Sequence, residues 1–82
     1  MMKPTIHLNG SGRESLINQY HEAYMKLQEA LVALRKIDVH GRDYYPQGPD
    51  AYSQASREHC KRMDAINEVQ KEIGEIWESL LP

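Results

Sequence analysis

The chain has 82 residues, one cysteine and a formal net charge of −2 at pH 7. A single cysteine excludes an internal disulfide, and the slightly acidic balance argues against a general nucleic-acid binder, which would be basic. A chain this short forms one domain, residues 1–82, and buries only a thin core. Small domains usually need a disulfide, a metal or further copies of themselves.

Two other classes are disfavoured by the sequence. No apolar run approaches the roughly 20 residues that cross a bilayer, and residues 1–12 lack the apolar centre of a signal peptide. The four histidines are scattered and no CxxC pair exists, so metal-ligand spacing is absent. We expect a cytoplasmic protein with no cofactor, no metal and no membrane partner, for which direct nucleic-acid binding is not expected.

Residues 1–10, MMKPTIHLNG, form the first predicted element. Thr5 to Leu8 favour a strand, with Ile6 and Leu8 alternating around His7. No second strand pattern follows in the chain. We interpret this segment as a short extended arm, or as a strand completed by another subunit.

The first long helix is predicted over residues 12–38. Ser11 and Glu14 have the spacing of a capping box, in which each side chain bonds a free backbone N–H of the first turn. Apolar residues then recur every three or four positions, which indicates one helix face. They are Leu16, Tyr20, Ala23, Leu27, Ala30, Leu34 and Ile37. A second line, formed by Ile17, Tyr24 and Leu31, runs beside the first.

Residues 39–49 are predicted to be a loop, and residues 50–80 a second long helix. Gly41 is a suitable end signal for the first helix, and Pro46 and Pro49 prevent either helix from continuing. The apolar stripe of the second helix is Ile66, Val69, Ile73, Ile76 and Leu80, flanked by Met63 and Trp77. Gly74 interrupts it at a cost of about 1 kcal/mol relative to alanine, and could allow close helix approach.

The predicted fold class is therefore all-α, with two long antiparallel helices and the short extended arm. The two apolar lines of the first helix are together wider than one partner helix covers. We expect a homo-oligomer, a dimer or higher, with a four-helix bundle as the simplest arrangement.

The connection between the helices is unusually rich in functional side chains. Arginine grips phosphate in a bidentate manner, and tyrosine supplies a stacking face and a hydroxyl group. Loops of this length are uncommon unless they have a function or are disordered. The predicted ligand-binding residues are Arg42, Tyr44, Tyr45, Gln47, Tyr52 and Arg57.

Simpler interpretations of the same residues stand beside this one. The charged residues could form solvated helix faces with ordinary ion pairs, such as Glu58 with Arg62. Tyr44 and Tyr45 could close the end of the bundle with their rings inward. His59 has no acid–base partner at a suitable spacing, and the adjacent Cys60 points about 100° away from it on a helix. We expect no enzyme activity.

The motifs IHLNG (Ile6 to Gly10) and GRDYYPQG (Gly41 to Gly48) together resemble a family of small proteins encoded by bacteriophages and proteobacterial prophages. The resemblance covers most of the chain. It implies a phage accessory protein that acts in the cytoplasm of the bacterial host. Small phage proteins of this kind often counter host defences.

Three functions remain open from the sequence. The first is a non-enzymatic protein that sequesters an anionic, nucleotide-type signal through the GRDYYPQG segment. The second is an inhibitor that binds a host defence protein, for instance a CRISPR effector. In that case an acidic ridge would imitate nucleic-acid phosphates, and its residues are Glu68, Glu72, Glu75 and Glu78. The third is a structural or assembly factor of the virion.

Overall fold

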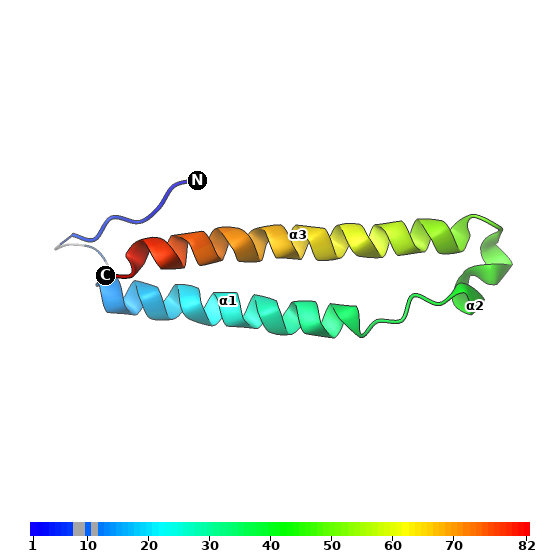
Figure 1. Ribbon diagram of the computed structural model, residues 1–82, viewed down its shortest axis with the longest axis horizontal. Helices are drawn as coiled ribbons and strands as arrows, with labels where there is room; N and C mark the ends of the chain where they lie inside the picture. The colour runs from blue at the N-terminus through cyan, green and yellow to red at the C-terminus, as the bar shows by residue number, and fades with distance from the viewer. Residues whose placement is uncertain (8–9, 11) are drawn as a thin grey trace.

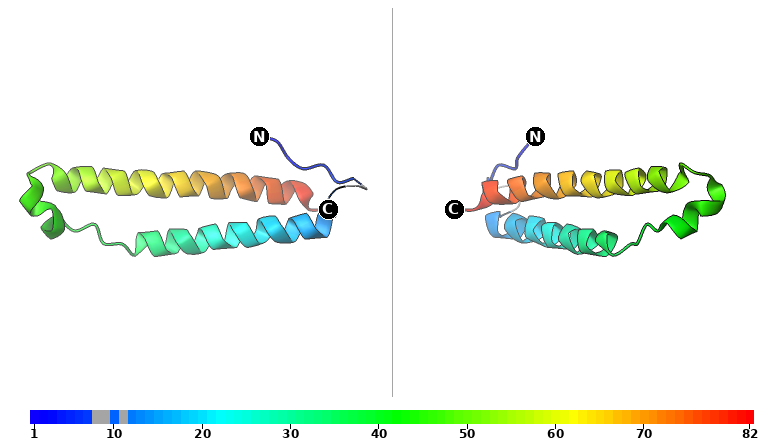
Figure 2. Two further views of the ribbon diagram at one scale, coloured as in Figure 1. Left: turned by 180° about the vertical axis from the view of Figure 1, so that it is seen from behind. Right: turned by 45° about the vertical axis from the view of Figure 1, so that its right-hand side comes forward.

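The computed structural model describes residues 1–7, 10 and 12–82, and within these residues it is helical with no strand. Two long helices, α1 (Arg13–Arg35) and α3 (Ala51–Leu80), are separated by α2 (Gly41–Tyr44) and by a short 3₁₀ helix, η1 (Tyr45–Gln47). α1 and α3 lie side by side and run in opposite directions (Figure 1), and the two further views in Figure 2 agree.

The start of α1 follows the predicted position closely. Gly12 is the N-cap residue and provides no side-chain cap, and Glu14 stands in the first turn where its charge favours the helix dipole. The predicted capping box depends on Ser11, which lies outside the described residues. So do Leu8 and Asn9 of the arm, whose described part up to His7 is extended rather than a strand.

α1 ends at Arg35, and the prediction that it continues to residue 38 is wrong. The backbone N–H groups of Lys36 and Ile37 donate to the carbonyl oxygens of Ala33 and Leu34, both at 3.1 Å, and these shorter-range bonds tighten the last turn. In addition, Nε2 of His59 lies 3.1 Å from the Leu34 oxygen. A carbonyl oxygen only accepts, so Nε2 carries the proton. α3 thus caps the end of α1.

Aromatic side chains and one glycine set the approach of the two long helices. The Trp77 ring centroid lies 5.3 Å from that of His21 and 6.5 Å from that of Tyr24. A methyl group at Gly74 would lie 3.0 Å from Cε2 of Tyr24, so the ring rests directly on the glycine backbone. The close approach expected at Gly74 is therefore a contact with an aromatic ring.

The helix pair buries few side chains. Among the described residues, Leu31 and Leu80 are the buried apolar ones, and Gln70 is buried beside them with 8% of its surface exposed. The line of Ile17, Tyr24 and Leu31 faces α3. Ala23 and Ala30 of the longer predicted line are exposed instead. The edge of α1 that carries Ala23 and Ala30 is therefore open to solvent among the described residues.

The molecule is elongated. It measures 61 × 21 × 18 Å with a radius of gyration of 18.4 Å, whereas a compact domain of this length would have a radius of gyration of about 12 Å. Because α1 is shorter than α3, the connection from Lys36 to Asp50 runs along the first turns of α3 (Figure 1). This geometry places the GRDYYPQG segment at one extreme end of the molecule.

Among the described residues, no helix has both the length and the apolar character that a membrane crossing requires.

Candidate ligand-binding site

The connection is more regular than the predicted loop over residues 39–49, because it contains α2 and η1. His40 starts α2 by accepting the backbone N–H of Arg42 on its Nδ1 atom, at 3.1 Å. This bond satisfies one of the free N–H groups at a helix start, as an asparagine or serine cap would. Pro46 stands at the start of η1, where its fixed φ angle suits a helical turn.

Gly48 turns the chain from η1 into α3. Its φ of 119° and ψ of 169° lie in a region that residues with a Cβ atom rarely adopt. The turn is closed by the Ala51 N–H, which donates to the Gly48 oxygen at 3.4 Å, and Asp50 is the N-cap residue of α3. Tyr52 consequently stands in the first turn of α3, and its ring lies 3.9 Å from the position that a Cβ atom of Gly41 would take.

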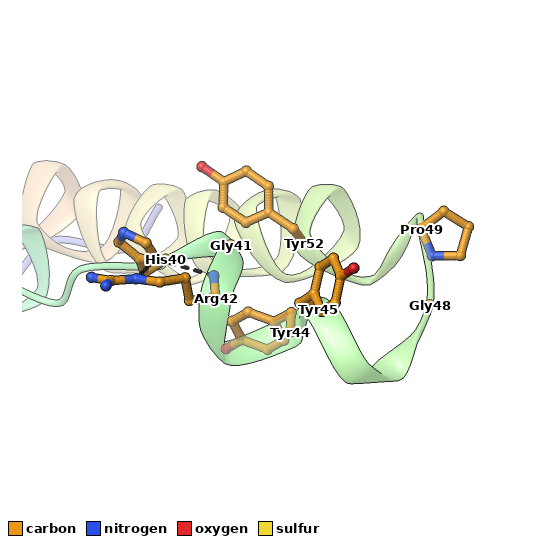
Figure 3. Close-up of a pocket in the computed structure, with 8 residues that line it drawn as sticks. All are labelled: His40, Gly41, Arg42, Tyr44, Tyr45, Gly48, Pro49 and Tyr52. Carbon is orange, nitrogen blue, oxygen red and sulfur yellow. Dashed lines mark hydrogen bonds between the residues drawn. The ribbon is translucent and has the colours of Figure 1, made fainter.

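These elements line an open cavity of about 810 Å³ at the end of the molecule. Figure 3 shows its side chains, which come from α2, η1, the Gly48 turn and the start of α3. Most of the lining is apolar or aromatic. The lining residues are His40, Gly41, Arg42, Tyr44, Tyr45, Gly48, Pro49 and Tyr52.

Arg42 is the cation of this cavity, and His40 holds it. Nε of Arg42 donates to Nδ1 of His40 at 3.3 Å, so the same ring nitrogen accepts two N–H groups from one arginine. Figure 3 shows the imidazole and the guanidinium side by side. The two terminal nitrogens of the guanidinium remain available for a bidentate contact with an oxyanion.

No carboxylate neutralises Arg42 within the described residues, where the one ion pair is Lys26 with Glu29 at 3.3 Å. The pair considered for Glu58 and Arg62 does not form, since Glu58 accepts a hydrogen bond from Gln54 at 3.3 Å instead. Arg42 is exposed and has no ion pair among the described residues, so its guanidinium is open to solvent or to a ligand.

The three tyrosines differ in their exposure. Tyr44 is half-buried, Tyr52 is exposed on one side, and Tyr45 has 84% of its surface exposed. A ring that faces inward and closes the end of the bundle would be mostly buried. Tyr45 is mostly exposed and therefore does not close the bundle in this way. A tyrosine with an open face can stack on a planar ligand ring.

The structure brings together four of the six predicted site residues. Arg42, Tyr44, Tyr45 and Tyr52 line the cavity, whereas Gln47 and Arg57 are exposed and do not line it. His40 was missed as a site residue. Histidine is not among the preferred N-cap residues, so no sequence pattern pointed to this role of His40.

Titratable side chains outside this cavity show no metal-ligand grouping within the described part of the chain. Among the described residues, no three His, Cys, Asp or Glu side chains gather in a way that could hold a metal ion. His59 is engaged with the end of α1, and the Cys60 side chain is exposed beside it.

Comparison of the chain with protein-family models, with curated proteins and with solved structures finds no match. The resemblance of the IHLNG and GRDYYPQG motifs to a phage protein family stays a prediction.

Proposed function

We propose that the chain is a non-enzymatic binding protein that sequesters an anionic, ring-bearing ligand of the nucleotide type in the cavity around Arg42. The observation that carries this proposal is the arrangement of Arg42. His40 orients its guanidinium, no described carboxylate neutralises it, and tyrosines flank it. The phosphate of the ligand would bind Arg42, and its base would stack on the exposed face of Tyr45.

The size of the cavity suits a ligand of this kind. Small-molecule sites usually enclose about 300–1,000 Å³ and combine apolar walls with a few polar groups, and this cavity of about 810 Å³ falls in that range. A purely apolar ligand would contact the tyrosines but not the guanidinium, and a bare phosphate would contact Arg42 but not the tyrosine rings. A ligand with both parts satisfies the whole lining.

A thermal-shift screen with cyclic and linear nucleotides tests the proposal. Ligand present at 100 times its dissociation constant raises the free energy of unfolding by about 2.7 kcal/mol. Inorganic phosphate and the corresponding nucleosides serve as partial ligands, and each should give a much smaller shift than the whole nucleotide. Absence of a shift with every nucleotide in the screen would refute the proposal.

Two variants separate the roles of charge and stacking. Loss of a charge-assisted hydrogen bond costs about 1.5–3 kcal/mol, so Arg42→Ala should weaken affinity roughly 10- to 100-fold. Loss of a base stack costs about 1–3 kcal/mol, so Tyr45→Ala should weaken it by a similar factor. Arg13→Ala is the matched control, since Arg13 is an exposed arginine at the start of α1, away from the cavity.

The biological setting that we propose is counter-defence in the cytoplasm of an infected bacterium. There a phage accessory protein would lower the concentration of a nucleotide signal by binding it. The two phage-like motifs support this setting, and one of them, GRDYYPQG, includes most of the cavity lining. Expression of the chain in cells that carry a nucleotide-signalled defence should restore phage growth, and expression of Arg42→Ala should not.

A second candidate is inhibition of a host defence protein through the acidic ridge. Glu68, Glu72, Glu75 and Glu78 are all exposed, and none is paired with a cation among the described residues. Replacing these four residues by glutamine would abolish inhibition through this surface and would leave nucleotide binding unchanged. Inhibition that persists after these four replacements would support the Arg42 cavity as the functional site.

A further inference from the structure

An apolar surface follows one side of the α1–α3 pair. Leu16, Ala23 and Ala30 recur at every seventh position of α1, and Val69, Ile73 and Ile76 follow the adjoining edge of α3. Leu16, Ala23 and Ile73 also line one shallow groove of about 180 Å³, which shows that the two edges meet. We call this surface the lateral face. None of its six residues carries a charge.

Much of the lateral face is open to solvent. Ala23 and Ala30 are exposed, and 45% of Val69 is exposed. The opposite side of the pair is more polar, because it presents His21, Gln28 and Asn67 beside Met25 and Val32. Apolar residues at a seven-residue spacing are typical of helices that pack against further helices.

The chain exposes more surface than a compact monomer of the same mass. A monomeric protein of 9.5 kDa exposes about 5,000 Å², whereas this chain exposes 6397 Å². The excess of about 1,300 Å² reflects the elongated shape, and it leaves room for a standard interface, in which each partner buries roughly 800 Å². The alanines allow the backbones of two helices to approach closely, and the groove at Ala23 can accept an apolar side chain.

We propose that the lateral face pairs with the same face of a second copy, with the two connections at opposite ends of the resulting four-helix unit. Charge selects this orientation. At the connection end, Arg35, Lys36 and Arg42 are balanced by Asp38, Asp43 and Asp50, whereas the acidic ridge in the other half of α3 has an excess of negative charge. Placing both connections at one end would bring the two acidic ridges together, while opposite ends keep them apart.

Each Arg42 cavity then remains complete within one chain. When the two lateral faces overlap fully, the two-fold axis that relates the two copies passes near residue 72 of α3. The two cavities then lie beyond the bundle, one at each end. Pairing through the lateral face is therefore independent of ligand binding in the cavity. A nucleotide could fail to bind while the pairing holds, and binding could persist in a chain that no longer pairs.

Light scattering on the purified chain tests the pairing. The parent should have a mass of at least twice 9.5 kDa. Ala30→Glu places a charge in the lateral face and should reduce the mass to that of a single chain. Val32→Glu places the same charge on the other side of α1 and should leave the mass unchanged. A monomeric parent, or an Ala30→Glu variant that keeps the parental mass, overturns the proposal.

A measurement on the parent covers the case in which Ala30→Glu does not fold. Unfolding of a paired chain shifts to higher temperature as protein concentration rises, because association stabilises the folded form. A midpoint that is constant between about 1 and 100 μM chain would exclude pairing. Circular dichroism of Ala30→Glu shows whether its helices persist.

Cys60 provides a test of orientation, since it is exposed and is the single cysteine of the chain. It lies twelve residues from the expected two-fold centre on α3. At a rise of 1.5 Å per residue, opposite connections separate the two Cys60 positions by about 36 Å along the bundle. If both connections lay at one end, the two Cys60 positions would be separated only by the width of the bundle, which is less than about 25 Å. Spin labels on Cys60 should report the longer distance, and only short distances would overturn the proposed orientation.

Discussion

Gln70 and Gln28 form a polar contact inside the helix pair, and its two members should respond unequally to mutation. Nε2 of Gln70 donates to Oε1 of Gln28 at 2.8 Å and lies 3.5 Å from the Tyr24 oxygen. Gln70 is buried, whereas Gln28 is half-buried at the edge of the contact. Gln28→Ala should therefore leave a buried donor of Gln70 without its best acceptor.

The expected magnitudes follow from this difference in burial. An unsatisfied buried polar group costs about 1–3 kcal/mol, so Gln28→Ala should lower the free energy of unfolding by that amount. Gln70→Leu removes the buried donor and adds apolar contact, while Gln28 can still reach water. We expect Gln70→Leu to lie within about 0.5 kcal/mol of the parent or above it, since an apolar replacement can be nearly neutral or stabilising.

Urea unfolding followed by circular dichroism at a fixed protein concentration measures these differences. Gln19→Ala is the matched control, because this exposed glutamine on the same helix hydrogen-bonds the exposed Ser15 at 3.0 Å. Its loss leaves no buried group unpaired and should change stability by less than about 0.5 kcal/mol. In the Gln70→Leu background, Gln28→Ala should lower the free energy of unfolding only slightly, because the buried donor is already absent. The reasoning is refuted if Gln70→Leu destabilises the chain more than Gln28→Ala does.

Two glycines carry further predictions. Gly48→Ala should lower the free energy of unfolding by about 1–3 kcal/mol, because its φ of 119° is strained for any residue with a Cβ atom. Chemical denaturation measures this loss, and Gly12→Ala, at an open position with an ordinary φ, should show no comparable loss. Gly74→Ala should fail to deliver the gain of about 1 kcal/mol that alanine normally brings to a helix interior, because the new methyl group would press on Tyr24. The same substitution in a Tyr24→Leu background should recover most of that gain, and a full gain with Tyr24 present would contradict this account of the packing.

The helical elements were predictable because their signals are local. Apolar spacing, Pro46, Pro49 and the glycines located both long helices to within a few residues. The short helices of the connection were missed, because α2 depends on the His40 side chain, and histidine is not a recognised helix cap. The cavity was predictable in part. Arg42 and the tyrosines were named from their chemistry, whereas Arg57 and Gln47 lie outside the lining, since the sequence does not show where a turn directs its side chains.

The sequence by itself determined that the chain forms two long helices and that the apolar surface of the first is wider than one partner can cover. Periodicity carries this information, because it depends only on which residues share a helix face. Only the tertiary structure decided that Ile17, Tyr24 and Leu31 face α3, that Ala23 and Ala30 remain exposed, and that Gln70 is buried in the contact. Several rotations of a helix can bury similar apolar area. The choice among them depends on close packing between both helices, such as the fit of the Tyr24 ring on Gly74.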